Sequence, residues 1–361
     1  MDGRADRGTI IATALLLLYG LVMVYSASAP FSLRAFGDGA HLFLKQLLAA
    51  GVGIAGLVLL AHIDYHRLQA LDDILLLGAF LLTVLTLLPL RGLSDGRWLR
   101  LAGFALQPTE LLKFALIVYV AATIVRKGQR IRSFTEGVLP FLVVLGVIAV
   151  VVIAQPDLGM TLILSALTLG LLFLGGAQLK HLALVVLGGL PFVFLAIRLA
   201  PYRLARVLSF LDPHAYSTSS GYQIIQSLVA IGSGGIFGRG LGASHAKLFY
   251  LPQAYNDFIF AVTAEELGMI GALILIGLFA LFAWRSFSVA KHAPDRFGRL
   301  LAMGIGFSIS LQAFLNLGVA LGILPVTGLT LPFISDGGSS LLITLCMVGV
   351  LLNISRQGQG G

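Results

Sequence analysis

Residues 324–340 read Leu-Pro-Val-Thr-Gly-Leu-Thr-Leu-Pro-Phe-Ile-Ser-Asp-Gly-Gly-Ser-Ser. This stretch joins two long apolar segments and spaces two prolines, three glycines and several hydroxyl residues among hydrophobic ones. Proline removes a backbone donor and glycine permits a left-handed φ, so the stretch is not one straight helix. Irregular backbone at membrane depth is tolerated only where protein or a water-filled cavity satisfies its polar groups. The sequence therefore predicts a binding or reaction chamber here, with a tight turn between helices as the alternative.

The composition assigns the chain to the polytopic membrane proteins. Of its 361 residues, 58% are hydrophobic and only 11% are charged, whereas soluble globular proteins carry about 25% charged residues. The first apolar stretch, residues 9–29, is too long for the core of a signal peptide and is expected to remain as a span. The single cysteine, Cys346, excludes an intramolecular disulfide and a cysteine-rich metal site. The net charge of +8 indicates lipid phosphates, not nucleic acid, as anionic partners.

Ten apolar segments have lengths suited to a membrane span. They cover residues 9–29, 41–61, 72–90, 108–126, 137–154, 159–174, 181–200, 257–284, 298–321 and 337–354. We therefore expect an all-α polytopic membrane protein with about ten transmembrane helices, forming a single domain over residues 1–361. The longest connection, residues 201–256, separates the seventh and eighth spans and is expected to be a large structured extracytoplasmic loop.

The distribution of lysine and arginine predicts the orientation. The short loops 126–136 and 285–299 carry four basic residues each, and such loops stay in the cytoplasm. With ten spans, this places both the N-terminus and the C-terminus on the cytoplasmic side.

Basic residues on the outer side oppose this insertion bias. They are Arg91, Arg97 and Arg100 in a short loop, and Arg203, Arg206, Arg239 and Lys247 within the long one. Arginine forks bind phosphate bidentately, so a substrate with phosphate groups at the outer leaflet would account for them. Attraction to anionic lipid headgroups is the alternative.

Two ionisable residues lie within the fourth span. Residues 107–114 read Gln-Pro-Thr-Glu-Leu-Leu-Lys-Phe, in which the proline suits the first turn of a helix. The spacing of three places Glu110 and Lys113 on one helix face, close enough to pair. Ionisable groups at this depth are costly and usually line a functional cavity. A structural ion pair that fixes helix packing is an alternative compatible with that role.

The long outer loop contains two distinct patterns. Residues 221–231 have apolar residues at helical spacing and predict a short amphipathic helix at the interface. Residues 232–242 contain six glycines in eleven positions, which would let backbone amides form an anion-binding nest. The run lacks the Gly-Lys-Ser/Thr ending of a P-loop, and a flexible hinge is the alternative.

Asp257 lies where this loop meets the membrane, directly before apolar residues. A carboxylate shielded from water has its charged form disfavoured, which suits it to act as a base. The alternative is a helix N-cap, a position that aspartate favours. Glu265 and Glu266 lie two turns deeper, and we expect one to face the cavity and the other a neighbouring helix.

The remaining polar residues indicate no other chemistry. The seven histidines show no zinc-ligand spacing. The serines lack a recognisable nucleophile elbow.

Motifs in order along nearly the whole chain resemble the SEDS family (shape, elongation, division and sporulation), which includes RodA, FtsW and SpoVE. They are Gly96-Arg-Trp-Leu, Gln107-Pro-x-Glu-x-x-Lys113, Gln155-Pro-Asp-Leu-Gly, Gly221-Tyr-Gln with Gln226-Ser227, Leu251-Pro252, Asp257-Phe-Ile-Phe, Glu265-Glu-Leu-Gly, and Asn316 through Ser340. Leu158 and Pro325-Val-Thr-Gly are more similar to the elongation member, RodA. Two positions depart from the family pattern: Asp336 replaces the usual tyrosine and Asn256 the usual threonine. The extra anion at Asp336 is expected near a phosphate site.

The resemblance implies a peptidoglycan glycosyltransferase that polymerises lipid II at the outer leaflet of the bacterial cytoplasmic (inner) membrane, for cell elongation and rod shape. It implies Asp257 as the catalytic carboxylate and a class B penicillin-binding protein (PBP2-like) and the elongation machinery as partners. The substrate-binding residues expected with it are Arg97, Glu110, Lys113, Arg206, Arg239, Lys247 and Ser339. No cofactor is required by this scheme, although a divalent cation (Mg²⁺ or Mn²⁺) shared by Asp257 and a diphosphate stays open.

Two other functions remain compatible with the sequence. A transporter that flips lipid II also needs a polar central cavity and would use a buried Glu–Lys pair. A structural scaffold would need neither Asp257 nor the outer arginines. The clustering of candidate residues on the outer half favours the enzyme.

Overall fold

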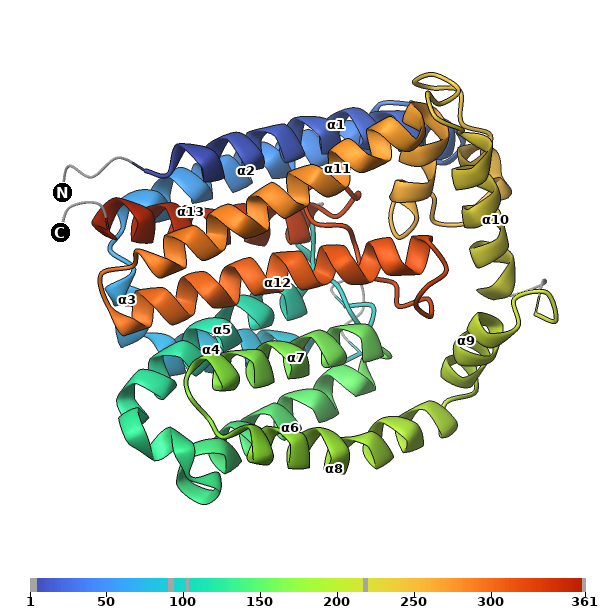
Figure 1. Cartoon of the computed structure of the whole chain (residues 1–361). Coiled ribbons are helices and arrows are strands. Elements are labelled where there is room, and N and C mark those ends of the chain that lie inside the picture. The colour runs from blue at the N-terminus through green and yellow to red at the C-terminus, as the bar shows by residue number, and fades with distance from the viewer. Residues whose placement is uncertain (1–4, 90–93, 102–103, 217–219, 359–361) are drawn as a thin grey trace.

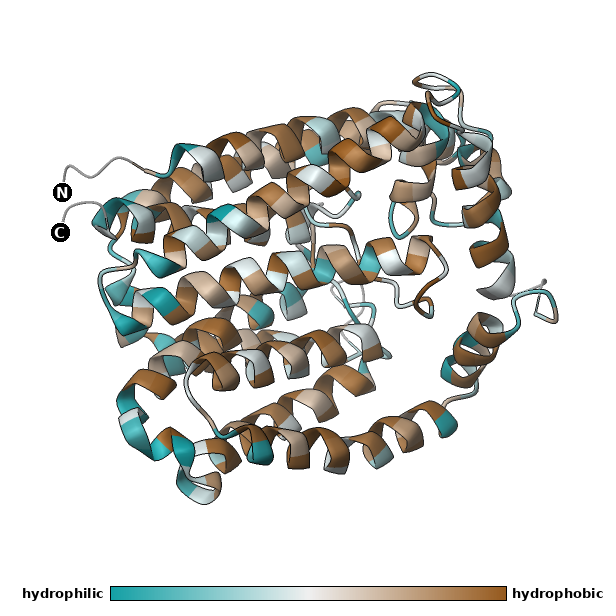
Figure 2. Ribbon diagram, in the orientation of Figure 1, coloured by the Kyte–Doolittle hydropathy of each residue, from teal (hydrophilic) through white to brown (hydrophobic). Residues whose placement is uncertain are grey.

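The computed structural model describes residues 5–89, 94–101, 104–216 and 220–358; Arg91 and the last residue of the third predicted span lie outside these ranges. The helices form a bundle with both chain termini at one end and helices α9 and α10 at the other (Figure 1). We call the latter the loop end. Hydrophobic residues cover the length of the helices, and hydrophilic residues gather towards the two ends of the bundle (Figure 2).

Each of the ten predicted spans corresponds to an apolar helix. These helices are α1 (Arg7–Phe36), α2 (His41–His62), α4 (Asp72–Leu85), α5 (Pro108–Lys127), α6 (Leu139–Ala154), α7 (Leu158–Leu174), α8 (Leu179–Arg198), α11 (Ile259–Lys291), α12 (Arg296–Ala320) and α13 (Gly338–Gly358). In the described part of the chain, eight helices are long and apolar enough to cross a membrane. Helices α7, with 17 residues, and α4, with 14, are shorter. The chain is therefore a multi-pass membrane protein.

Short elements connect these helices. They are α3 (His66–Ala70), the hairpin of β1 (Leu99–Leu101) and β2 (Phe104–Leu106), η1 (Gly128–Arg132), η2 (Phe134–Val138), α9 (Pro201–Leu211), α10 (Ser220–Ser233) and η3 (Ala246–Tyr250). The hairpin is antiparallel, with Arg100 opposite Ala105. Helix α10 confirms the predicted amphipathic helix, whereas α9 was not expected from the sequence.

Local sequence explains where several helices begin. Pro108 stands in the first turn of α5, where its missing N–H costs nothing. Asp157 caps α7 by accepting a hydrogen bond from the Met160 amide at 2.9 Å, and Asp295 caps α12 through the Gly298 amide at 2.9 Å. Such caps satisfy amides that the helix itself leaves unpaired.

The core lies among helices α5, α12 and α13, while α8 packs at the periphery and is almost entirely unburied. Helix α2 packs closely along α13. Gly349 of α13 allows this approach, because a Cβ there would collide with the backbone of Leu57. Close helix contacts through small residues are typical of membrane bundles, where packing replaces the hydrophobic driving force.

Residues 321–337 form no helix or strand, which confirms that the stretch between α12 and α13 is irregular. Side chains from neighbouring helices satisfy its carbonyl groups. Gln312 donates to the Thr330 carbonyl at 3.0 Å, Asn316 to that of Leu329 at 2.6 Å, and Gln46 to that of Ser335 at 3.0 Å. This is the condition under which irregular backbone persists at membrane depth.

Both termini lie at the same end of the bundle, as an even number of spans requires (Figure 1). The side of the membrane that this end faces stays a prediction.

Candidate active site

A polar pocket of about 290 Å³ surrounds Asp257 near the loop end. It is assembled from segments far apart in sequence: the residues before β1, the start of α5, the turn before α7, helices α9 and α10, the residues before α11 and the irregular stretch before α13. Its polar lining residues are Arg97, Trp98, Gln107, Glu110, Asp157, Arg206, Gln223, Gln253, Asn256, Asp257 and Thr330. The irregular stretch also contributes Val326, Gly328 and Leu329, so it lines a pocket, and the role of that pocket as a binding or reaction chamber stays a prediction.

Asp257 precedes the first residue of α11, and Phe258 occupies the N-cap position of that helix. The N-cap alternative for Asp257 is therefore wrong. Its side chain makes no hydrogen bond to any described residue, and Oδ1 is buried. Burial raises the pKa of Asp257 to about 6, with Arg206 and Arg97 opposing this rise and Asp157 adding to it. The Asn316 amide donates to the Asp257 carbonyl at 2.9 Å and fixes the backbone. An oriented, unpaired carboxylate of this kind can accept a proton.

Two of the predicted cations reach this pocket. The Arg97 guanidinium donates to the carbonyl oxygens of Gln155, at 2.7 Å, and Pro156. Among the described residues, Arg206 makes one hydrogen bond, a long one of 3.5 Å to the carbonyl of Val326, and its guanidinium lies 6.0 Å from the centroid of the Tyr202 ring. Most of the N–H donors of Arg206 are therefore available to a ligand. Two guanidinium groups beside one carboxylate suit a diphosphate whose leaving oxygen carries negative charge.

Asp157 lines the pocket together with Asp257 and Glu110, and sequence reasoning missed it. It lies 3.8 Å from Arg97, and burial raises its pKa. The motif Gln155-Pro-Asp-Leu-Gly was recognised, but nothing in its spacing indicated that the aspartate faces Asp257. The cap that it forms on α7 gives this residue a structural role as well.

The Glu110–Lys113 pair lies beside the pocket, as predicted. Lys113 Nζ is 2.6 Å from Glu110 Oε2 and 2.6 Å from Gln312 Oε1, and both charged side chains are buried. Glu110 lines the pocket, whereas Lys113 is not among its lining residues. Because Gln312 also holds the Thr330 carbonyl, the pair connects α5 to α12 and to the irregular wall. The Glu110–Lys113 pair therefore both lines the cavity, through Glu110, and fixes the packing of α5 against α12, through Lys113.

Ser339 lies in the first turn of α13 and does not line the pocket. Its hydroxyl accepts a hydrogen bond from the Gln107 amide at 3.2 Å. Ser339 therefore supports the start of α5, and the prediction that it contacts substrate has no geometric support.

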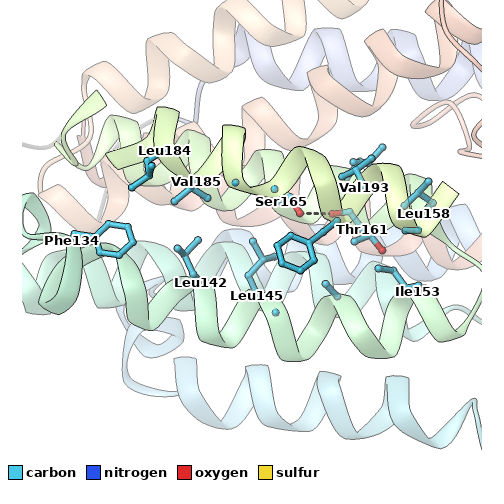
Figure 3. A pocket seen from close by; sticks show the side chains of 17 residues that line it. Phe134, Leu142, Leu145, Ile153, Leu158, Thr161, Ser165, Leu184, Val185 and Val193 are labelled. Atoms are coloured by element: carbon cyan, nitrogen blue, oxygen red, sulfur yellow. Dashed lines mark hydrogen bonds between the residues drawn. The ribbon is translucent and has the colours of Figure 1, made fainter. Parts of the chain in front are cut away.

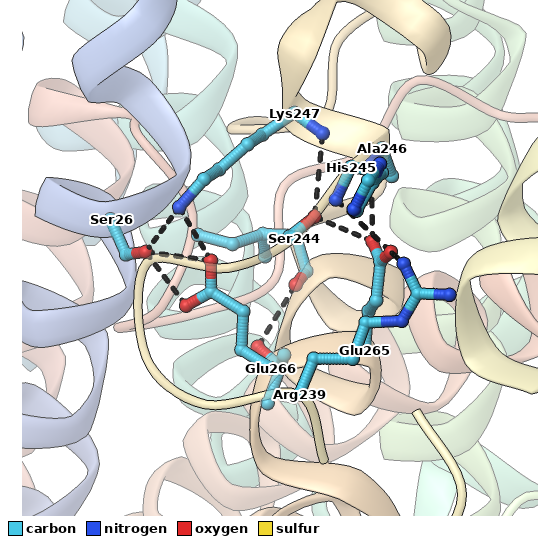
Figure 4. Close-up of polar contacts among 10 residues, drawn as sticks. Ser26, Arg239, Ser244, His245, Ala246, Lys247, Glu265 and Glu266 are labelled. Carbon is cyan, nitrogen blue, oxygen red and sulfur yellow. Dashed lines mark hydrogen bonds and ion pairs between the residues drawn. The ribbon is translucent and has the colours of Figure 1, made fainter. Parts of the chain in front are cut away.

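Arg239 and Lys247 are placed away from Asp257, in a separate polar cluster (Figure 4). We define the saturated cluster as Ser26, Arg239, Ser244, Lys247, Glu265 and Glu266. The structure does not bring its two cations into the Asp257 pocket, because two carboxylates of α11 hold them.

Every carboxylate of the saturated cluster is fully engaged. Glu265 accepts hydrogen bonds from Ser244 Oγ at 2.6 Å and from the amides of His245 and Ala246 at 3.0 and 3.1 Å, and pairs with Arg239 at 3.3 Å. Glu266 pairs with Lys247 at 2.6 Å. Glu266 also faces α1, as expected for one of the two glutamates, since Ser26 donates to it at 2.7 Å. Glu265 lines a small cavity with Arg239, not the Asp257 pocket.

The glycine run 232–242 is not an anion-binding nest. Its amides at Arg239 and Gly240 donate to the carbonyls of Glu265 and Glu266, each at 3.0 Å. These carbonyls are free because α11 is kinked at Gly268, where φ is +68°. The run packs against this kink, so its glycines permit close backbone contact.

An apolar cavity of about 610 Å³ lies between α6, α7 and α8 (Figure 3). Its lining is apolar apart from Thr161 and Ser165, and it contains no charged residue. It can accommodate hydrocarbon but offers no group for acid–base chemistry.

Among the described residues, no group of three or more His, Cys, Asp or Glu side chains is placed to hold a metal ion. Asp157 and Asp257 share the pocket, so a divalent cation bound there would need further oxygen ligands from a substrate.

Comparison with known proteins identifies the family. The family model described as "Cell cycle protein" (FtsW/RodA/SpoVE) matches residues 7–360. A probable peptidoglycan glycosyltransferase FtsW of Geobacter sp. (strain M18) is 42% identical over 98% of both chains. Stage V sporulation protein E of Bacillus subtilis is 41% identical over 97% of this chain and 96% of its own.

Two solved structures share the fold. One, described as "Structural coordination of polymerization and crosslinking by a peptidoglycan synthase complex", is 31% identical, covers 99% of both chains and superposes with a TM-score of 0.80. Thermus thermophilus RodA is 30% identical over 98% of this chain and 97% of its own, with a TM-score of 0.70. The curated relatives carry the names FtsW and SpoVE. These names do not support the expectation that the chain is more similar to RodA than to the other members of the family. The chain belongs to the FtsW/RodA/SpoVE family, the SEDS family of membrane proteins.

Proposed function

We propose that this protein is a peptidoglycan glycosyltransferase that polymerises lipid II into glycan strands. The observation that carries the proposal is Asp257, whose carboxylate has one buried oxygen and no hydrogen-bond partner among the described residues, in a pocket with Arg97 and Arg206. The names of the curated relatives support it. Such a pocket supplies a base and two phosphate-binding cations within one enclosed volume.

In the proposed reaction, Asp257 accepts the proton from the 4-hydroxyl of the acceptor GlcNAc. The hydroxyl oxygen forms a bond to the anomeric carbon of the donor MurNAc, and the bond from that carbon to undecaprenyl pyrophosphate breaks. Inversion produces a β-1,4 linkage. Arg97 and Arg206 stabilise the negative charge that the pyrophosphate gains as it leaves.

The other predicted residues act around this centre. Glu110, supported by Lys113, forms the pocket floor. Arg239 and Lys247 hold the outer loop against α11 and are assigned no contact with substrate. The proposed location is the bacterial cytoplasmic membrane, with both termini in the cytoplasm and the pocket facing outwards.

A class B penicillin-binding protein is the proposed partner. One of the similar solved structures is described as a peptidoglycan synthase complex with coordinated polymerisation and crosslinking, which supports a crosslinking partner. The role in elongation remains a prediction from Leu158 and residues 325–328, and the names of the curated relatives favour a different role. Depletion of the protein in its own cells tests this: round cells would support elongation, and filaments would support division.

The central experiment measures lipid II polymerisation by the purified protein with its partner, whose transpeptidase serine is disabled. Wild type is compared with Asp257→Asn and with Asp212→Asn, which makes the same change on an exposed residue of the outer loop. We expect strands from wild type and Asp212→Asn and a loss of about 10²–10⁴-fold for Asp257→Asn, the usual contribution of a general base.

Folding can be followed separately, by thermal unfolding in detergent. Because burial disfavours the ionised Asp257, removal of its charge should not lower stability at neutral pH. Equal strand formation by wild type and Asp257→Asn would remove this residue from the mechanism. If an intact wild-type complex makes no strands but moves lipid II across vesicle membranes, the transporter alternative replaces the enzyme.

A further inference from the structure

The backbone segment that carries Asp257 is not held by its own helix. Residues 255–257 lie before the first residue of α11, outside any helix or strand. In a regular helix, the Asp257 carbonyl would accept a hydrogen bond from the amide four residues later. Here the Ala261 amide donates instead to the Phe258 carbonyl, at 2.9 Å. The position of Asp257 therefore depends on contacts from other parts of the chain.

Three groups from distant parts of the chain each donate a hydrogen bond to one of three successive carbonyls in this segment. They are the Asp336 amide to Tyr255 at 3.1 Å, the Ser335 hydroxyl to Asn256 at 2.6 Å, and Asn316 Nδ2 to Asp257 at 2.9 Å. The donors of Ser335 and Asn316 are side chains, and both residues are buried. Because carbonyls away from water need donors, these two side chains stabilise one backbone conformation of the segment.

Asn316 also fixes the wall of the pocket that faces the Asp257 carboxylate. Its Nδ2 donates a second hydrogen bond, at 2.6 Å, to the Leu329 carbonyl in the irregular stretch. The preceding residue, Gly328, lies opposite the carboxylate, since a Cβ added there would be 3.7 Å from Asp257 Oδ2. A single side chain of α12 thus joins the backbone of Asp257 to the wall in front of its carboxylate.

The orientation of the Asn316 amide is set by these two acceptors. Both are carbonyl oxygens, which can only accept, so Nδ2 faces them and Oδ1 is left buried without a partner among the described residues. A buried acceptor without a donor costs free energy, so packing alone does not explain an asparagine here. Its two N–H donors do, because neither a serine nor an apolar residue of similar size would supply both.

We infer that Asn316 is a positioning residue for Asp257 and that Ser335 supports it. Together they hold the backbone so that the carboxylate faces the pocket without bonding to the cations there. The charged residues that line the pocket with it are Arg97, Glu110, Asp157 and Arg206. The positioning role rests on the proposed glycosyl transfer and deepens it, because it adds two residues that act on the base without touching substrate.

Three variants of the full-length protein separate positioning from packing. Asn316→Leu removes both donors with a side chain of similar size, and Ser335→Ala removes one donor with a smaller change. Asn353→Leu is the matched control, since Asn353 is also a buried asparagine whose Nδ2 donates to a backbone carbonyl, that of Ala61 at 3.0 Å. It lies in the last turns of α13, far from the pocket. Thermal unfolding in detergent measures the stability of each variant.

An infrared titration reports on Asp257 without turnover. Subtracting the spectrum of the matching Asp257→Asn double variant isolates the carboxyl band of this residue. The wild-type midpoint is expected near the raised pKa of about 6. In Asn316→Leu it should fall by about 1–2 pH units, because a released carboxylate can bond to Arg206 or to water, which favours its charged form. In Asn353→Leu it should not move.

Polymerisation kinetics give the second measurement. Asn316→Leu should lower kcat about 10–100-fold, the effect of a misplaced reacting group. The KM should stay within about twofold, because the cations that bind substrate are unchanged. The acid limb of its rate profile should move to lower pH with the infrared midpoint. Ser335→Ala should change kcat and the midpoint in the same directions but less, and Asn353→Leu should change only stability.

Three results would overturn the inference. One is an unchanged or higher midpoint in a folded Asn316→Leu protein, or in Ser335→Ala if the first variant does not fold. Another is an equal loss of turnover in Asn316→Leu and Asn353→Leu, which would indicate packing alone. The third is a raised KM with unchanged kcat, which would indicate substrate binding. If wild type makes no strands, the proposed function fails, yet the infrared midpoints still decide whether Asn316 positions Asp257.

Discussion

Two groups of charged side chains lie at the same end of this bundle, and they differ in how their charges are paired. In the saturated cluster, Glu265 accepts four hydrogen bonds besides its contact with Arg239, and Glu266 is bonded to Lys247 and Ser26. In the Asp257 pocket, the carboxylate makes no hydrogen bond to a described residue. Both combine carboxylates with basic side chains, and α11 or the residues directly before it contribute to each.

The difference separates structural charges from chemical ones. Buried polar groups are normally satisfied, because an unpaired one costs free energy. A saturated pair is therefore explained by the fold, whereas an unpaired carboxylate beside the guanidinium group of Arg206, which makes only one long hydrogen bond to a described residue, indicates a ligand or reaction site. The comparison predicts that mutations in the saturated cluster change stability and that mutations in the pocket change turnover.

The largest stability effect is expected for Lys247→Ala. The change leaves Glu266 as an uncompensated buried charge, which should cost about 3–5 kcal/mol of unfolding free energy. Thermal or denaturant unfolding in detergent measures it. The double variant Lys247→Met with Glu266→Met removes both charges and should recover most of the loss. If the single variant were as stable as wild type, the cluster would not be structural.

Helix α9 offers a matched pair of arginines for the next test. Arg206→Ala removes a largely free guanidinium from the pocket and should lower kcat/KM about 10–100-fold, the value of charge-assisted hydrogen bonds. Stability should remain near wild type.

Arg203→Ala is the comparison variant. Its guanidinium donates to Tyr202 Oη at 2.7 Å and to the carbonyls of Ala196 and Ile153, each at 3.0 Å. Its loss should therefore lower the unfolding temperature and leave kcat/KM of the folded protein near wild type. If Arg203→Ala lowered kcat/KM while Arg206→Ala lowered only the unfolding temperature, Arg206 would not be the cation that acts in the pocket.

The pH dependence of polymerisation tests Asp257 as the base. Because its pKa is raised to about 6, the carboxylate is protonated below that pH and cannot accept a proton. The rate should rise with pH through this range and then level off, with a loss of about tenfold at pH 5. Asp336 also has a pKa of about 6, so the profile should be repeated in Asp336→Asn. Disappearance of the acid limb in that variant would assign it to Asp336 instead.

The smallest effect is expected for Gly328→Ala. Gly328 has φ of +76°, and a Cβ there would lie 3.7 Å from Asp257 Oδ2. Strain should cost roughly 1–2 kcal/mol, while the methyl group narrows the pocket without a clash. Turnover should fall only a few-fold, as the kinetic assay would measure. Gly232→Ala, where φ is not in the left-handed region and a Cβ would meet nothing within 4 Å, is the control and should lose less stability.

Much of the site could be predicted from the sequence, and the errors share a cause. Asp257, Glu110 and the irregular stretch were identified because a charge beside an apolar span and a proline–glycine pattern are local features. Arg239 and Lys247 were assigned to the substrate because a basic residue in an outer loop gives no sign of its partner. Asp157 was missed for the same reason.

The sequence by itself determined the membrane class, the ten apolar helices, the irregular segment and the pairing of Glu110 with Lys113. Each follows from residues close together in the chain, through summed hydropathy, backbone preference or helical spacing. Only the tertiary structure decided which charges are saturated and which remain free. That choice depends on distances between separate helices, as when α11 presents Glu265 and Glu266 to the outer loop but leaves Asp257 to face Arg97 and Arg206. The strength of an ion pair depends on the distance between its two charges, and no periodicity in the sequence encodes the distance between residues of separate helices.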